Sequence, residues 1–265
     1  MRDKRGWDAV VISEGEMASR RPHRAQVQQG DHQAPLQLSA PVPFNMRPAG
    51  EVRPHRTLCI ARRPDSAESQ QYRLLRYRLK ETSNPRIIGI SSPMPDEGKT
   101  TVAANLALAL AEGRRVKIAL LDLNLRKPAL GTLFGLSVPG SVAEQLRTKR
   151  GNPDAYWDVL ELGSRLHIMG GSAKVDNPAP LLNSPELSLL LQDLAEFYDY
   201  VVVDLPAVLK AADVKSIQSE LDALVLVCRA GKTTKWSLAQ AVDQLGAGKI
   251  HGALMLAVND RHITG

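Results

Sequence analysis

Glycine, lysine and threonine stand together in the segment SSPMPDEGKTT, residues 91–101, between an apolar run and an Ala- and Leu-rich stretch. These flanks predict a strand, a tight turn and the start of a helix. At such a turn, backbone N–H groups and the positive end of the helix dipole bind phosphate. Lys99 would neutralise phosphate charge, and the Thr100 hydroxyl can ligate Mg²⁺. Pro93 replaces the first glycine of the full phosphate-loop pattern, so an ordinary glycine-containing turn is the alternative.

Two acidic residues end other apolar runs. The segment IALLDLNLRKP places Asp122 and Asn124 just past one run, and YVVVDLP places Asp204 at the end of another. A lone aspartate at a strand end is more often a cap of a turn or helix. Two such acids, together with Gly-Lys-Thr in one α/β pattern, instead predict a nucleotide site in which Mg²⁺ is held between carboxylates and phosphates.

A parallel sheet would bring these residues together. Apolar runs predict strands at 86–91, 116–123, 166–170, 200–205, 223–229 and 253–258. Helices are predicted at 66–81, 100–112, 141–146, 185–196 and 235–245. Continuous runs such as ALVLV indicate central strands covered on both faces. The alternation predicts an α/β fold with a doubly wound, mostly parallel sheet of the P-loop NTPase type and a site at the carboxyl ends of its strands.

Composition is consistent with one such domain and a tail. The 265 residues are 43% hydrophobic but only 4% aromatic, so the core is expected to be aliphatic. Cys59 and Cys228 lack metal-ligand spacing and suit a reducing cytoplasm. We find no apolar run of the roughly 18 residues needed to span a bilayer, and no apolar core of a signal peptide.

Three regions are predicted along the chain. Residues 1–60 are a disordered, basic, Pro-rich tail, residues 61–84 a basic amphipathic helix, and residues 85–265 a P-loop nucleotide-binding domain. The helix would expose Arg73, Arg76 and Lys80. Its apolar side is predicted to comprise Tyr72, Leu74, Leu75 and Leu79.

The basic charge is concentrated at the front of the chain. Residues 1–86 carry 16 Lys or Arg against 9 Asp or Glu, whereas the remainder carries 18 against 19. Such a front could contact an anionic membrane, nucleic acid or an acidic partner, or could simply be a solvated tail. Aromatic residues that would stack on bases are scarce there, which argues against nucleic acid.

Three segments resemble the nucleotide motifs of the bacterial tyrosine kinases: SSPMPDEGKTTVAANLALALA, IALLDLNLRKPALGTLFGL and YVVVDLPAVLKAADV. These kinases are cytoplasmic partners of polysaccharide co-polymerases, related to deviant phosphate-loop ATPases of the MinD and ParA type. The resemblance spans about residues 66–258. It implies a protein-tyrosine kinase that uses ATP and Mg²⁺ in exopolysaccharide or capsule biosynthesis, at the inner face of the plasma membrane. Its partners would be a Wzz-like membrane co-polymerase, tyrosine-bearing protein substrates and further copies of itself.

The resemblance also assigns site residues. It implies that Lys99 and Asp122 are catalytic, and that Mg²⁺ is held by Thr100, Asp122 and Asp204. The residues implied to bind the nucleotide are Asp96, Glu97, Gly98, Lys99, Thr100, Thr101 and Arg126.

Three positions depart from the family pattern. Asn124 stands where the second motif usually has a further aspartate, implicated in activating the tyrosine hydroxyl, and an amide cannot accept that proton. Asp96 replaces a glycine, although aspartate tolerates positive φ better than most residues. Gln70 replaces the acid that begins the family's assembly motif, while Arg73 and Arg76 remain.

The five tyrosines all precede or lie within the segment that leads into the third motif. The tyrosine-rich tail common in the family is not matched, so self-phosphorylation of a tail is not expected and the substrate is expected to be another protein. The sequence leaves three functions open. These are an active kinase, an ATP-dependent conformational switch without kinase chemistry, and a positioning ATPase of the MinD and ParA type. The last class usually has an extra lysine early in its loop, and SSPMPDEGK has none.

Overall fold

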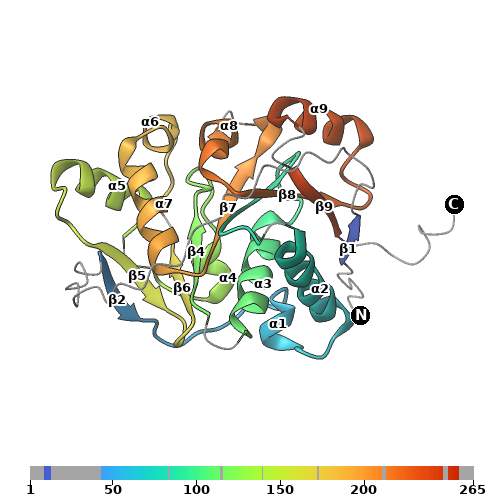
Figure 1. The fold of residues 1–265 in the computed structure, drawn as a ribbon, viewed down its shortest axis with the longest axis horizontal. Helices are drawn as coiled ribbons and strands as arrows, with labels where there is room; N and C mark the ends of the chain where they lie inside the picture. Colours follow the sequence, from blue (N-terminus) through green and yellow to red (C-terminus); the bar gives the residue numbers. More distant parts are fainter. Residues whose placement is uncertain are drawn as a thin grey trace, which may run out of the picture.

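A computed structural model describes residues 9–12, 43–82, 84–113, 116–138, 140–171, 173–210, 213–246 and 250–256. Within them nine strands form one sheet in the order β1-β9-β8-β3-β7-β4-β6-β5-β2 (Figure 1). The strands are β1 (Ala9–Ile12), β2 (Phe44–Pro48), β3 (Ile87–Ser92), β4 (Ile118–Asp122), β5 (Trp157–Glu161), β6 (Leu166–Met169), β7 (Tyr200–Ala207), β8 (Ala223–Arg229) and β9 (Ile250–Leu256). Only the pairs β1·β9 and β5·β6 are antiparallel among these strands.

Helices cover both faces of this sheet (Figure 1). One face carries α1 (Cys59–Arg62), α2 (Ala67–Thr82), α3 (Lys99–Ala111) and α4 (Leu130–Phe134). The other carries α5 (Val142–Gly151), α6 (Ala179–Leu182), α7 (Pro185–Phe197), α8 (Asp213–Ile217) and α9 (Lys235–Leu245). Short 3₁₀ turns, η1 (Val208–Lys210) and η2 (Gln218–Glu220), flank α8.

The apolar runs alternate between two cores. In β7, Val201 and Val203 pack into the core beneath α5–α9, whereas Val202 packs into the core beneath α1–α4. Because successive strand residues point to opposite faces, a strand covered on both sides must be apolar throughout. The predicted doubly wound, mostly parallel α/β sheet is therefore confirmed.

The predicted elements are found with small shifts at their ends. Each predicted strand begins and ends within three residues of its observed bounds, apart from residues 257–258, which lie outside the described residues. Helix α5 runs five residues beyond the predicted 141–146. The sequence did not reveal β1, β2, β5 or the short helices α1, α4, α6 and α8.

Part of the predicted disordered tail is folded, which corrects the boundary at residue 60. Strand β1 pairs with β9, and β2 pairs in parallel with β5 at the other end of the sheet. Phe44 is buried, with its ring centroid 5.3 Å from that of Phe197 and 5.7 Å from that of Tyr198. Burial of this aromatic ring offsets the conformational entropy that is lost when β2, which follows a proline, becomes ordered. Residues 1–8 and 13–42 of the predicted tail lie outside the described residues.

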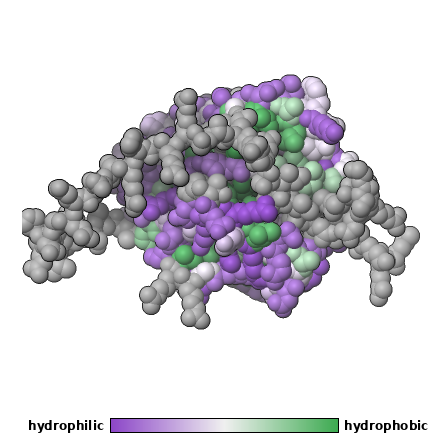
Figure 2. All heavy atoms as spheres, turned by 45° about the vertical axis from the view of Figure 1, so that its right-hand side comes forward, coloured by the Kyte–Doolittle hydropathy of each residue, from purple (hydrophilic) through white to green (hydrophobic). Residues whose placement is uncertain are grey.

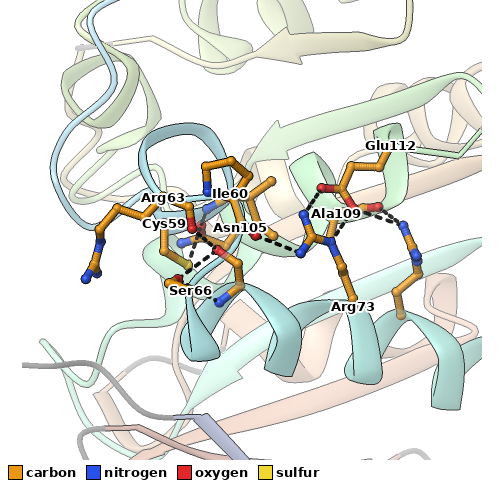
Figure 3. Close-up of polar contacts among 11 residues, drawn as sticks. Cys59, Ile60, Arg63, Ser66, Arg73, Asn105, Ala109 and Glu112 are labelled. Carbon is orange, nitrogen blue, oxygen red and sulfur yellow. Dashed lines mark hydrogen bonds and ion pairs between the residues drawn. The ribbon is translucent and has the colours of Figure 1, made fainter.

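Helix α2 is fixed to α3 by polar contacts (Figure 3). Arg73 donates to both carboxylate oxygens of Glu112, at 2.8 and 2.5 Å, and Arg76 donates to the Ala109 carbonyl and to Glu112. Buried Asn105 of α3 accepts the Ile60 amide at 3.2 Å and so joins α1 to the same unit. The two arginines expected to serve assembly are thus bonded within their own chain.

The predicted apolar side of α2 is correct for three of its four residues. Tyr72, Leu75 and Leu79 are buried, but Leu74 is 40% exposed because it lies about 100–160° around the helix from them. Hydrophilic residues make up most of the coloured surface in Figure 2. No helix in the described part of the chain has the length and apolarity to cross a membrane.

Replacing Glu112 should weaken the attachment of α2. Glu112→Gln is expected to lower the free energy of unfolding by about 1 kcal/mol at pH 7. The hydrogen bond from Arg73 holds the pKa of Glu112 below its ordinary value of 4.5. The stabilisation is therefore present above that pH and is lost as the pH falls through the lower folded-state pKa.

Urea unfolding of the parent and of Glu112→Gln at pH 7 and pH 3 measures this. The difference should shrink at pH 3, whereas exposed Asp243→Asn should match the parent at both pH values. A difference between parent and Glu112→Gln that is equal at pH 7 and pH 3 would contradict the role of Glu112.

Candidate nucleotide and metal site

The sheet order brings the three predicted motifs together. Strands β3, β7 and β4 are neighbours, so the turn after β3 and the acids ending β4 and β7 share one edge of the sheet. Asp122 and Asp204 are paired in register across β4 and β7. Thr100, in the first turn of α3, donates its hydroxyl to Asp204 Oδ2 at 2.7 Å.

The loop reaches α3 through two left-handed residues. Asp96 has φ of 59° and Gly98 has φ of 97°, so aspartate does adopt the conformation that the replaced glycine would take. For a residue with a side chain this costs about 1–2 kcal/mol. The Asp96 carboxylate is paired with Lys127 Nζ at 3.0 Å, which lowers its pKa. Lys127 thus offsets a charge that would otherwise repel phosphate.

A second segment holds the loop from outside. Lys232 Nζ donates to the carbonyls of Pro95, at 2.8 Å, and Asp96, at 3.2 Å, and Arg229 also donates to Asp96 O. In a planar trans peptide the next N–H points opposite to the carbonyl. These contacts therefore turn the amides of Asp96 and Glu97 away from the cations, which is the arrangement of an anion-binding nest.

Glu97 links the loop to the segment before α9 through a buried carboxylate. Its side chain is fully buried, one carboxylate oxygen accepts the Met94 amide at 2.7 Å, and the other accepts the Thr233 hydroxyl. Thr233 in turn accepts the Arg229 amide at 2.7 Å. The Glu97 carboxylate, which the sequence assigns to nucleotide binding, is engaged in joining the loop to the segment before α9.

The two acids differ in how they are satisfied. Asp122 accepts backbone amides from Asn124, Ala129 and Leu130, at 3.1, 2.9 and 3.2 Å. Burial raises its pKa to about 6, although these bonds and Lys99 oppose the shift. Burial and the neighbouring Asp122 charge raise the pKa of Asp204 to about 8.

These acids fit a divalent cation. Asp204 Oδ1 is buried and has no hydrogen-bond partner among the described residues. A positive charge there would relieve both the missing contact and the repulsion between carboxylates. The described residues hold no cluster of three or more His, Cys, Asp or Glu, so the protein ligands would be two carboxylates and a hydroxyl. Oxygen ligands with phosphate completing the shell are what Mg²⁺ prefers.

The other predicted residues divide into two groups. Lys99 and Thr101 lie in the first turn of α3, and Lys99 is only 8% exposed. Arg126 instead contacts the Asp213 carboxylate, at 3.2 Å, and the Asp176 carbonyl. Asn124 is buried and donates to the Lys127 carbonyl at 3.0 Å.

Sequence reasoning missed Lys127, Lys232 and Thr233. Lys127 was visible as a cation after the second motif. Lys232 and Thr233 follow an apolar strand in the run RAGKTTK, but their position beside the loop depends on β8 pairing with β3. Strand order was not available from the pattern of the sequence.

Comparison with known proteins finds relatives that are named as tyrosine kinases or as exopolysaccharide biosynthesis proteins. No protein-family model matches the chain. It is 33% identical over 208 residues to tyrosine-protein kinase YwqD of Bacillus subtilis, covering 77% of this chain and 86% of that protein. It is 33% identical over 158 residues to the succinoglycan biosynthesis transport protein ExoP of Rhizobium meliloti, covering 57% of this chain but 19% of ExoP. The kinase domain of Escherichia coli tyrosine kinase ETK superposes on this chain with a TM-score of 0.70 at 25% identity. The match covers 82% of this chain and 85% of the ETK kinase-domain chain.

Asp204→Asn should have opposite effects on stability and on ligand binding. The substitution keeps an acceptor for Thr100 but removes one of two adjacent buried charges, so the metal-free protein should melt at a higher temperature at pH 8. The same loss of charge should weaken Mg²⁺-dependent nucleotide binding. Thermal melts and calorimetric titration with nucleotide, with and without Mg²⁺, measure both. Exposed Asp243→Asn serves as a control outside the site, and a lower melting temperature for Asp204→Asn would contradict the repulsion.

Thr233→Ala should loosen the phosphate-binding loop. It removes the hydroxyl that Glu97 accepts, and a buried acceptor left without its donor costs about 1–3 kcal/mol. We expect a lower free energy of unfolding and weaker nucleotide binding, both restored in Thr233→Ser. If Thr233→Ala binds nucleotide as the parent does, the Glu97 contact does not organise the loop.

Proposed function

This chain belongs to the bacterial tyrosine-protein kinase family, and from that premise we propose that it transfers the γ-phosphate of ATP to tyrosine side chains of proteins. The observation that carries the proposal is the register pair Asp122 and Asp204 beside Thr100, with Asp204 Oδ1 left without a partner. This is an arrangement that a Mg²⁺–phosphate unit completes.

Each residue has a role in this proposal. Lys99, at the start of α3, contacts the β- and γ-phosphates, and the loop amides of residues 96–101 surround them. Mg²⁺ would be held by the Thr100 hydroxyl and the carboxylates of Asp204 and Asp122. The Mg²⁺ supplies charge neutralisation at the transferring phosphoryl group. Arg126 contacts phosphate only if it leaves Asp213, so we place it at the rim.

Asn124 limits proton transfer but not positioning. Its amide cannot act as a general base, so the tyrosine proton would pass to solvent or to Asp122. Phosphoryl transfer depends mainly on alignment and on charge stabilisation, which Lys99 and the acids provide. The kinase can therefore retain activity with a slower step.

Asn124 also supports a second candidate, an ATP-dependent conformational switch without kinase chemistry. Its side chain donates to the Lys127 carbonyl, and Lys127 pairs with Asp96 in the loop. Asn124 is thus part of the support for the loop, a role that needs no proton acceptor.

We further propose that the chain acts in exopolysaccharide or capsule biosynthesis with a membrane co-polymerase, at the inner face of the membrane. The similarity to ExoP supports this, because ExoP is named for succinoglycan biosynthesis and transport. This chain spans 19% of the length of ExoP.

Phosphotransfer by three proteins tests the function: the parent, Lys99→Ala and Asn124→Asp. With Mg-ATP and a random glutamate–tyrosine copolymer, the parent should produce phosphotyrosine and Lys99→Ala should not. Asn124→Asp should be faster, because a carboxylate can accept the proton. Activity only in Asn124→Asp would support the switch instead, whereas equal activity in Lys99→Ala would contradict both candidates.

A further inference from the structure

The tyrosines of this chain are unequally available to a kinase. All five lie in the described residues, and Tyr72, Tyr198 and Tyr200 are at most 8% exposed. Burial raises the pKa of each of these three hydroxyls. The two remaining tyrosines are Tyr77, 57% exposed, and Tyr156, 58% exposed.

Tyr77 is a poor phosphate acceptor despite its exposure. It lies in the middle of α2, where helical hydrogen bonds on both sides keep its backbone from extending into another protein's active site. Its hydroxyl donates to the Glu81 carboxylate at 2.5 Å, one helical turn away. A phosphate dianion on Tyr77 would face that carboxylate, and like charges at i and i+4 repel each other.

Tyr156 lies in a better setting. It is in the loop between α5 and β5, preceded by the exposed turn residues Pro153 and Asp154. Asp158, two residues further along the chain, is already paired with Arg47 at 3.1 Å. An extended, exposed residue next to a turn is the kind of segment that can enter another protein's active site.

The backbone on either side of Tyr156 is fixed. Lys149 Nζ donates to the Ala155 carbonyl at 2.8 Å, and the Trp157 amide donates to the Pro43 carbonyl at 2.8 Å. The Trp157 side chain is 1% exposed and donates to Asp193 at 2.7 Å. The backbone on both sides of Tyr156 is therefore held in place, so this residue cannot move to another part of the surface of its own molecule.

Its own nucleotide site is out of reach. Because β5 runs antiparallel to β6, Tyr156 lies at the same edge of the sheet as Asp122 and Asp204. Four interstrand steps, β3 to β7 to β4 to β6 to β5, separate it from the phosphate-binding loop. At about 4.8 Å a step this is about 19 Å, farther than one side chain can span.

We propose that Tyr156 is a self-phosphorylation site, modified by the active site of a second copy of this chain. The inference rests on the proposed kinase function and names a substrate for it. The Tyr156 oxygen of one molecule attacks the γ-phosphorus of ATP bound to the other. A P–O bond to tyrosine forms, the bond to the β–γ bridging oxygen breaks, ADP leaves, and the phenolic proton passes to solvent.

Mass spectrometry of the full chain after incubation with Mg-ATP locates the phosphate. The tryptic peptide of residues 151–165 contains Tyr156 as its sole tyrosine, so its phosphorylation is unambiguous. Tyr156→Phe should lose self-phosphorylation, the matched variant Tyr77→Phe should keep it, and both should phosphorylate the glutamate–tyrosine copolymer as the parent does.

Mixing two variants tests transfer between molecules. A size-tagged Lys99→Ala chain, which keeps Tyr156, should gain phosphotyrosine from Tyr156→Phe, which keeps Lys99. The proposal would be overturned if the phosphate were found on Tyr77. It would also be overturned if the parent were phosphorylated alone but the Lys99→Ala chain gained no phosphate in the mixture. Activity on the copolymer without self-phosphorylation would also overturn it while the kinase function stands. Activity on neither would overturn both.

Discussion

Two carboxylates lie side by side at the carboxyl ends of β4 and β7, in a place where water cannot hydrate them. Two buried carboxylates must be neutralised by protons or by a cation. The surrounding structure offsets part of their lost hydration with hydrogen bonds and a positive charge. Asp122 receives three backbone amides, and Asp204 receives the Thr100 hydroxyl. Lys99 adds a positive charge nearby. Asp204 Oδ1 is left without a hydrogen-bond partner among the described residues, and under the proposed function a bound cation would supply that missing contact.

The loop over these acids is stabilised from outside and not by its own sequence. Asp96 occupies a left-handed conformation that glycine would adopt freely, and its charge needs a partner. Lys127 supplies that partner from the β4 side, while Lys232 and Thr233 hold the loop from the β8 side. The departure from the family's glycine is thus accommodated by cations from two other segments.

The sequence predicted the α/β fold, the central strands and the convergence of residues 96–101, Asp122 and Asp204, because these depend on local apolar runs and on polar residues at strand ends. It did not predict β2 and β5, whose pairing depends on Phe44 and Trp157 meeting from distant segments. Nor did it predict the buried setting of Glu97, because Thr233 becomes its neighbour only once β8 lies beside β3. Local pattern is read from a sequence, whereas strand order is set by the packing of the whole sheet.

Strands β1 and β2 form the two ends of the sheet, and both come from the first 48 residues. Their neighbours β9 and β5 would otherwise present unpaired N–H and C=O groups to solvent, a template for strand addition by other chains. One proteolytic event after residue 48 would thus open the sheet at both ends at once. The segment that looks most dispensable in the sequence thus ends the sheet in two short strands, of four and five residues, and its loss would leave the seven-residue β9 as an edge.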